Sequence, residues 1–321
     1  MSSTVSIIAV LEARRRIAPH VRRTPLVHSA WLSRATGADV WLKLENQQRT
    51  NAFKVRGAFN AALRLAERGE RPALVTASAG NHGRALAEAA AATGMSCIVF
   101  TPSDAPRTKL DAIEAAGARL DASSRNYDAA EIAAKDYAAS TGACFISPYT
   151  HPDVIAGGGT VAVEMIEDQP RLDVVVVPMG GGGLISGTGV ALAAMAPGCR
   201  LIGVEAEASE AFGTARRHGR ITTIDPQPTI ADGLGGNLEP NAVTFDYVQR
   251  YVPEIVAAAE ASILGAIADL AGHDHQIAEG AAAVGPAALA SGRIADIAGK
   301  TIGVVLTGAN IDRARLARCL A

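Results

Sequence analysis

The feature that most constrains the fold is a recurring unit: a short β-branched run, a few small or polar residues, and an alanine-rich helical stretch. The first unit joins residues 73–77 to a second strand-like run at 96–100. The second joins 173–178 to 200–205, and the third is 301–310 followed by a closing helical stretch. Strands that alternate with helices build parallel sheets through βαβ crossovers, so we expect an α/β fold that binds ligands where its strands end.

The length of the chain predicts two domains, each built on an open twisted sheet. The 321 residues are roughly twice the length of a typical domain. A glycine- and proline-containing stretch at 148–159 is typical of a crossing between domains. We therefore expect a large discontinuous domain of residues 1–57 and 149–321 and a small, mobile domain of residues 58–148.

Composition excludes several classes of protein. Hydrophobic residues make up 49% and charged residues 19%, which is typical of a folded globular chain. The net charge of −2 leaves no basic excess for nucleic acid or an anionic membrane. The apolar run at 5–11 precedes its basic cluster, which is the wrong order for a secretory signal, and the four cysteines form no close pair. We expect a cytoplasmic protein with neither nucleic acid nor membrane as partner.

Four consecutive glycines stand between a predicted strand and a predicted helix: Gly180, Gly181, Gly182 and Gly183. Bare amides and a helix N-terminus can converge there on a phosphate, whereas a tight turn alone would need only one glycine. A nicotinamide-dependent oxidoreductase is the runner-up, because Glu205 follows about 20 residues later, where a ribose-binding acid would lie. The spacing does not satisfy GxGxxG, since Ile185 and Ser186 occupy the places of the final glycine.

Two further segments predict polar chemistry at strand ends. Lys54 follows an apparent strand and opens a helix, where the helix dipole disfavours a cation and so favours a nucleophilic amine. The alternative is an ordinary solvated lysine. Residues 78–82 end one strand and begin a helix, so their amides and polar side chains suit a carboxylate or a phenolic oxygen. The alternative is a simple capped turn.

Four motifs together resemble the tryptophan-synthase-β-like (fold type II) pyridoxal-phosphate enzymes. They are NAFKVRGA at 51–58, SAGNHG at 78–83, GGGGLISG at 180–187 and TGAN at 307–310. All four motifs follow one another along the chain in the family's order. Within that family they most closely resemble those of the threonine/serine dehydratases, which include serine racemase. The resemblance therefore covers nearly the whole chain.

The resemblance implies pyridoxal 5'-phosphate as cofactor, with Lys54 as the Schiff-base lysine and catalytic residue. Thr307 would face the pyridine nitrogen, and Glu279 resembles an acidic residue near the ring, although it could instead be a surface glutamate. The implied cofactor-binding residues are Phe53, Lys54, Asn81, Gly180, Gly181, Gly182, Gly183, Leu184, Glu279 and Thr307. The implied substrate-binding residues are Ser78, Ala79, Gly80, Asn81 and His82.

Some relatives bind a divalent cation near the segment that matches residues 203–205. Three carboxylates are available there as hard oxygen ligands: Glu205, Glu207 and Glu210. The alternative is three solvated glutamates, and Ala211 stands near the place of a relative's aspartate. A divalent cation therefore stays open beside the main cofactor.

The implied activity is that of an ammonia-lyase, or dehydratase, which converts a threonine- or serine-like β-hydroxy L-amino acid to a 2-oxo acid and ammonia. One alternative is a racemase of the same fold, although Ala79 stands where racemase-like members have a serine. Another is a dehydratase for a phenylserine-, hydroxyaspartate- or hydroxyectoine-derived substrate, since residues 232–245 differ from those of a standard threonine deaminase. A non-catalytic protein that binds a phosphorylated metabolite is the alternative of a different class. The family implies a homodimer, and the end of the chain one helix after TGAN favours a catabolic role.

Overall fold

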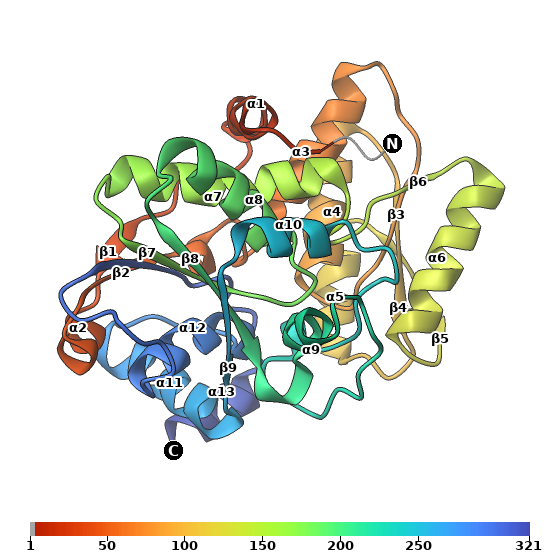
Figure 1. Cartoon of the computed structure of the whole chain (residues 1–321). Helices are drawn as coiled ribbons and strands as arrows, with labels where there is room; N and C mark the ends of the chain where they lie inside the picture. Colours follow the sequence, from red (N-terminus) through yellow and green to blue (C-terminus); the bar gives the residue numbers. More distant parts are fainter. Residues whose placement is uncertain (1–3) are drawn as a thin grey trace.

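The computed structural model describes residues 4–321 and contains two sheets (Figure 1). The larger sheet has six strands in the order β1-β2-β10-β7-β8-β9, and the smaller has four in the order β5-β4-β3-β6. Neighbouring strands run parallel in both sheets, except for the antiparallel pair β1 and β2. The predicted α/β class with two open sheets is confirmed.

The larger sheet is assembled from both ends and the middle of the chain. Its strands are β1 (Leu26–His28), β2 (Asp39–Lys43), β7 (Val174–Pro178), β8 (Arg200–Ala206), β9 (Glu254–Ala258) and β10 (Thr301–Val305). The smaller sheet comes from one continuous stretch. Its strands are β3 (Leu74–Ala77), β4 (Cys97–Pro102), β5 (Arg119–Ser124) and β6 (Cys144–Phe145).

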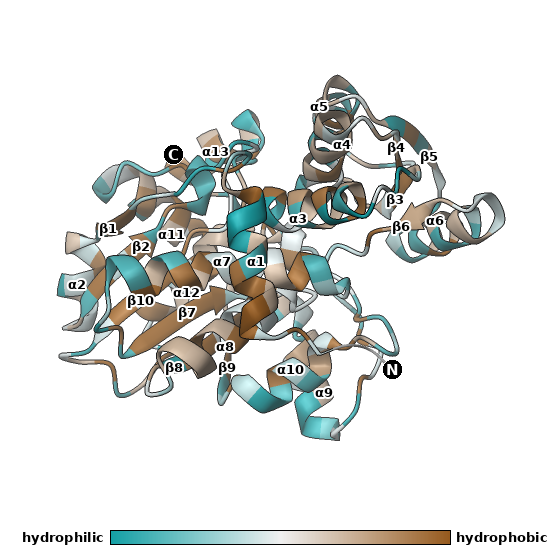
Figure 2. Ribbon diagram, turned by 90° about the horizontal axis from the view of Figure 1, so that it is seen from above, coloured by the Kyte–Doolittle hydropathy of each residue, from teal (hydrophilic) through white to brown (hydrophobic). Residues whose placement is uncertain are grey.

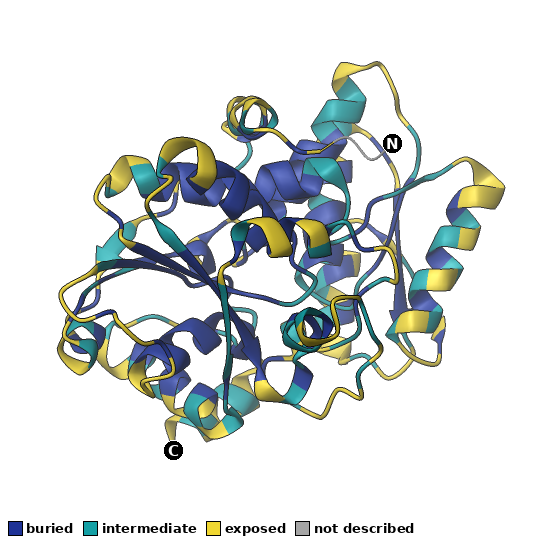
Figure 3. Cartoon of the chain, viewed as in Figure 1, coloured by how far each residue is buried: buried dark blue, intermediate teal, exposed yellow. Residues whose placement is uncertain are grey.

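Helices cover both faces of the larger sheet, which explains why its central strands are valine-rich and buried (Figures 2 and 3). One face carries α7 (Pro152–Asp168) and α8 (Gly183–Met195), with α1 (Ile7–Ile17) and α10 (Thr244–Tyr251) packed outside them. The other face carries α11 (Glu260–His273) and α12 (Gly280–Ala290), flanked by α2 (Ala30–Thr36) and α13 (Arg313–Leu320). Helix α9 (Ala211–His218) follows β8.

The smaller sheet is also covered on both faces. Helix α6 (Tyr127–Thr141) packs on β3 and β4. The other face carries α3 (Lys54–Glu67), α4 (Asn81–Thr93) and α5 (Arg107–Ala115). Three short 3-10 helices complete the chain: η1 (Glu45–Gln47), η2 (Glu207–Ser209) and η3 (Asp232–Leu234). Within residues 4–321, no helix is both long and apolar enough to cross a membrane.

The stretch at 148–159, which was expected to cross between domains, contains the start of helix α7 at Pro152. The glycines of this helix allow neighbouring helices to pack closely against it. A Cβ on Gly157 would lie 2.6 Å from the carbonyl oxygen of Arg56, and one on Gly159 would lie 2.8 Å from that of Gly187. Helix α7 therefore approaches α3 and α8 at backbone distance, which no larger residue permits.

The strand order brings three of the predicted segments to one edge of the larger sheet. Strands β2, β10 and β7 are neighbours and run parallel, so their carboxyl ends lie side by side. The chain leaves those ends toward Lys54, toward Thr307 and toward Gly180, respectively. Parallel sheets bind ligands at this edge, so the topology assembles a site from distant parts of the sequence.

Candidate active site

The four-glycine segment forms a tightly packed turn between β7 and α8, which we call the glycine cradle (residues 180–183). Gly182 has a φ of +84°, a conformation that favours glycine. A Cβ on Gly180 would lie 3.0 Å from Cα of Leu234, and one on Gly181 would overlap the ring of Tyr149. Within the described chain, no side chain caps the N-terminus of α8. Its amides are therefore available to an anion.

Lys54 is the first residue of α3, and its amine faces the polypeptide and not open solvent. Its Nζ donates a hydrogen bond to the carbonyl oxygen of Pro148 at 2.9 Å and lies 5.2 Å from the centre of the Phe53 ring. Enclosure by protein lowers the pKa of Lys54 to about 8, while the carboxylate of Glu279 acts in the opposite direction. A lysine with this pKa is a competent nucleophile and proton acceptor near neutral pH.

The segment after β10 is fixed directly beside the lysine segment. The amide of Phe53 donates to the carbonyl of Thr307 at 3.0 Å, and the amide of Ala309 donates to the carbonyl of Asn51 at 2.8 Å. Ala52 and Gly308 form a β-bridge between these two bonds. The buried Thr307 and the half-buried Lys54 are thus placed near each other by main-chain hydrogen bonds.

A chain of side-chain hydrogen bonds joins the smaller sheet to the larger one. Nδ2 of Asn81 donates to Glu279 Oε1 at 2.7 Å, and Nδ2 of Asn310 donates to Oδ1 of Asn81 at 2.6 Å. Burial, reinforced by the charge of Asp232, raises the pKa of Glu279 to about 7. Glu279 therefore lies beside two of the predicted motifs and is not a solvated surface residue. The hydrogen bond of Asn310, the last residue of TGAN, was not predicted from the sequence.

The loop at residues 78–82 lies at the carboxyl end of β3, as its sequence predicts. Its Ser78, Ala79 and Gly80 are half-buried, and the amide of Gly80 donates to Ser78 Oγ at 3.3 Å. His82 is buried, with Nε2 3.2 Å from the carbonyl of Ile146, while its Nδ1 meets no hydrogen-bond partner among residues 4–321.

The environment of His82 keeps its ring neutral. Burial lowers the pKa of His82 to about 3, and the neighbouring charge of Lys54 acts in the same direction. A neutral imidazole with a free nitrogen can donate or accept a hydrogen bond without adding charge to the site.

The three candidate metal ligands are engaged elsewhere. Glu205 accepts hydrogen bonds from the amides of Phe212 and Gly213, at 2.7 and 2.8 Å, and so caps α9. Glu207 pairs with an arginine at 2.6 Å, and Glu210 pairs with another at 3.3 Å. Across residues 4–321, no three His, Cys, Asp or Glu side chains are grouped to hold a metal ion.

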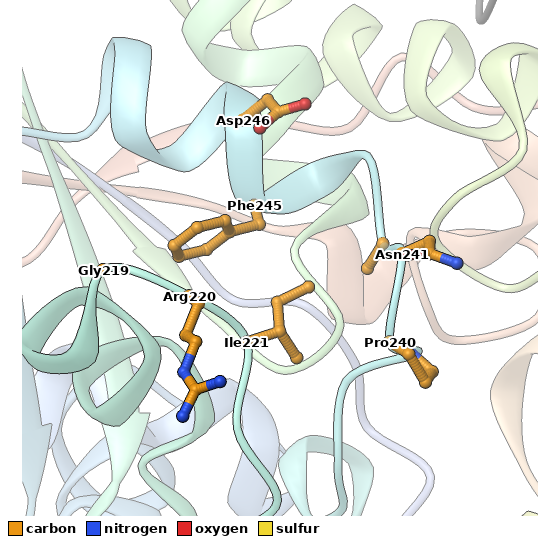
Figure 4. Close-up of a pocket in the computed structure, with 8 residues that line it drawn as sticks. Gly219, Arg220, Ile221, Pro240, Asn241, Phe245 and Asp246 are labelled. Carbon is orange, nitrogen blue, oxygen red and sulfur yellow. The ribbon is translucent and has the colours of Figure 1, made fainter.

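A cavity of about 370 Å³ opens between the end of α9 and the start of α10 (Figure 4). It is lined by Arg220, Ile221 and Phe245, among others, and by none of the residues predicted to bind cofactor or substrate. The cavity therefore adds no residue to the site at the strand ends.

A lysine of lowered pKa beside a glycine cradle, at the edge of a parallel sheet, defines an enzyme site for a phosphorylated carbonyl cofactor. The model of a family described as "Pyridoxal-phosphate dependent enzyme" matches residues 17–308, so the chain belongs to this family. Fold type II is the architecture that the two sheets have.

Known proteins are similar to this chain along nearly all of its length. The chain is 41% identical over 303 residues to the L-threonine ammonia-lyase of Thermotoga maritima, covering 94% of this chain and 75% of that protein. It is 38% identical over 307 residues to the beta-hydroxyaspartate dehydratase of Paracoccus denitrificans, covering 96% of each. Its fold superimposes on maize serine racemase with a TM-score of 0.93 and 31% identity, over 98% and 97% of the two chains.

The residues present fit pyridoxal phosphate. The cradle presents the amides of α8 at a place where a Cβ would clash, which suits a phosphate group. The amine of Lys54 suits the cofactor's carbonyl carbon, and the unpartnered Nδ1 of His82 leaves a polar atom for a ligand. These three features come from three different strand ends.

Proposed function

We propose that this protein is a pyridoxal-phosphate-dependent ammonia-lyase that converts a β-hydroxy L-amino acid to a 2-oxo acid and ammonia. The observation that carries the proposal is the position of the Lys54 amine. It bonds the carbonyl of Pro148, whose neighbour Tyr149 packs on the glycine cradle, and it lies within the influence of the charge of Glu279, which accepts from Asn81. The threonine ammonia-lyase and the hydroxyaspartate dehydratase named above support this reaction class, since both act on β-hydroxy amino acids by name. The overall reaction balances, because the water lost from Cβ is regained when ammonia is released.

In this proposal the protein's residues bind, orient and move protons. When bound, pyridoxal phosphate supplies an electron sink for the bond broken at the substrate's Cα. Lys54 would hold the cofactor through Nζ, and once the substrate's amine has replaced it there, the freed Nζ would take the Cα proton. Thr307 would offer a neutral hydroxyl to the pyridine nitrogen. Unlike a carboxylate, a hydroxyl has no negative charge to keep that nitrogen protonated, so elimination is favoured over transamination. The cofactor is held by Phe53, Lys54, Asn81, Gly180, Gly181, Gly182, Gly183, Leu184, Glu279 and Thr307.

The substrate is bound by the loop at the end of β3. The amides there and the neutral His82 receive the substrate's carboxylate, and the loop comprises Ser78, Ala79, Gly80, Asn81 and His82. Racemisation would need an acid or base on the face opposite Lys54, and Ala79 provides neither. We therefore favour lyase activity over racemase activity.

Three features of the whole protein belong to the same proposal. Residues 1–57 and 149–321 form the large cofactor-binding domain, and residues 58–148 form a small domain that closes over the substrate. The protein acts as a homodimer. It works in the cytoplasm, a location supported by four unpaired cysteines.

Covalent trapping tests the assignment of Lys54. The cofactor-free protein is incubated with pyridoxal phosphate, reduced with borohydride and analysed by peptide mass spectrometry. The proposal expects the label on Lys54, no label at that peptide in Lys54→Ala, and unchanged labelling in the matched control Lys300→Ala. A label spread over exposed lysines, unchanged in Lys54→Ala, would contradict the proposal.

A further inference from the structure

Two residues after Lys54, α3 carries an arginine that is 0% exposed. Arg56 pairs with two carboxylates in the interior, Glu45, 0% exposed, and Glu164, 5% exposed, and Glu164 also pairs with Lys43, 0% exposed. We call these four residues the Arg56 cluster. Two positive and two negative groups balance, so the cluster adds no net charge to the interior.

The guanidinium of Arg56 forks to both carboxylates. Its Nε and Nη2 donate to the two oxygens of Glu45 at 2.8 and 2.7 Å. Its Nη1 and Nη2 donate to the two oxygens of Glu164 at 2.7 and 2.8 Å. Lys43 then donates to Glu164 Oε2 at 2.6 Å. Paired forks of this kind fix orientation as well as distance.

The other three members of the Arg56 cluster belong to the larger sheet or to the elements packed on it. Lys43 ends β2, Glu45 lies in η1 directly after it, and Glu164 lies on α7. The rest of α3 packs toward α4 of the smaller sheet through residues such as Phe59, and it also packs along α7 of the larger sheet. Helix α3 thus lies between the two sheets, and the Arg56 cluster joins its first turn to the larger one.

Burying four charges has a large desolvation cost, and apolar residues of similar volume often stabilise a protein at least as well. Stability alone therefore does not explain the cluster, whereas its fixed geometry does. We propose that Arg56 is a positioning residue: through Glu45 and Glu164 it holds the first turn of α3, and Lys54 with it, to the sheet that carries the glycine cradle. This inference rests on the proposed role of Lys54. Its consequence is that Lys54 and the cradle keep their separation when the smaller sheet moves.

The structure provides a matched control on the same pair of helices. Arg64 of α3 donates to Asp153 of α7 at 2.7 Å, about three turns beyond Lys54. The double variant Arg56→Met/Glu45→Gln removes one positive and one negative charge and leaves Lys43 paired with Glu164. The control Arg64→Met/Asp153→Asn makes the same change of charge farther from the amine.

The first readout is independent of activity and of cofactor. Amide hydrogen exchange is measured on residues 52–58 of the cofactor-free proteins. We expect exchange there to be at least about tenfold faster in Arg56→Met/Glu45→Gln, with wild-type rates in the control. Equal rates in both variants and wild type would overturn the proposal, as would equal acceleration in both variants.

The second readout concerns the amine itself. We expect covalent capture of pyridoxal phosphate by Lys54 to slow by roughly 100-fold in Arg56→Met/Glu45→Gln, because a small misplacement near the reacting atoms has effects of that size. We expect inorganic phosphate to inhibit capture at the same concentration as in wild type, since the cradle is unchanged. Wild-type capture by the variant would overturn the proposal.

If the double variant does not fold, Arg56→Lys replaces it, because lysine keeps the charge but not the fork. Slower capture at an unchanged melting temperature would support positioning, and capture at the wild-type rate would overturn it. Failure of wild-type Lys54 to capture the cofactor would instead count against the proposed function, and the exchange comparison would still stand.

Discussion

The lowered pKa of Lys54 predicts how fast the cofactor-free protein captures pyridoxal phosphate. Enclosure brings this pKa from the ordinary 10.5 down to about 8. At pH 7 a pKa of about 8 leaves about a tenth of the molecules with a neutral amine, against roughly one in 3,000 for an exposed lysine. Because only the neutral amine attacks a carbonyl, capture at pH 7 should be about 300-fold faster than by free lysine.

The assay follows the absorption band of the bound cofactor after mixing across about pH 6 to 10, with Nα-acetyl-lysine as reference. The capture rate of the protein should rise with pH and level off above about pH 8. Its ratio to the reference rate should therefore be constant below that pH and fall above it, because free lysine goes on gaining neutral amine. Glu279→Gln should move this midpoint to lower pH, because it removes a negative charge that favours the ammonium form. A midpoint at the ordinary lysine value, in either protein, would refute the argument from enclosure.

Three further predictions concern the cradle, the buried carboxylate and metal. Gly181→Ala should weaken cofactor affinity and destabilise the fold by about 1–3 kcal/mol, because the added Cβ overlaps the Tyr149 ring. In the control Gly198→Ala the added Cβ meets nothing within 4 Å, so affinity and stability should stay unchanged. Titration with cofactor measures the affinity, and thermal melting measures the stability. Burial raises the pKa of Glu205 to about 7, so its contribution to stability falls as pH rises from about 4.5 to 7, and Glu205→Gln should flatten the melting temperature over that range; an unchanged pH profile would contradict this. A chelator should change neither melting temperature nor activity, because the candidate ligands are engaged elsewhere, and loss of activity restored by Mg²⁺ would overturn this.

The sequence predicted those site residues whose position depends only on where a strand ends or a helix begins. Gly180 and Thr307 lie just after β7 and β10, as the small or polar residues behind β-branched runs predicted, because strand and helix periods are local properties. Lys54 opens α3, as predicted, although it follows β2 only after η1. Their meeting at one edge depends on β10 lying between β2 and β7, which no local pattern fixes. The recognised motifs supplied that arrangement through their resemblance to a family.

Contacts between distant segments explain what the sequence did not predict. Asn310 reaches Asn81 across 229 positions, and Arg56 reaches Glu164 across 108. A buried arginine is indistinguishable in sequence from an exposed one, so Arg56 drew no attention beside Lys54. The close packing of the α7 glycines was not predicted for the same reason, since only the packed structure shows which backbone they contact.

The substrate assay tests the central claim most directly. Purified protein loaded with pyridoxal phosphate is given a panel of β-hydroxy amino acids, including threonine, serine and 3-hydroxyaspartate, and 2-oxo acid, ammonia and substrate chirality are measured in the same tubes. We predict 2-oxo acid and ammonia in equal amounts from at least one member, no racemisation, and no product with Lys54→Ala. Inversion of chirality without ammonia, or turnover that persists in Lys54→Ala, would contradict the assignment as a lyase that acts through Lys54.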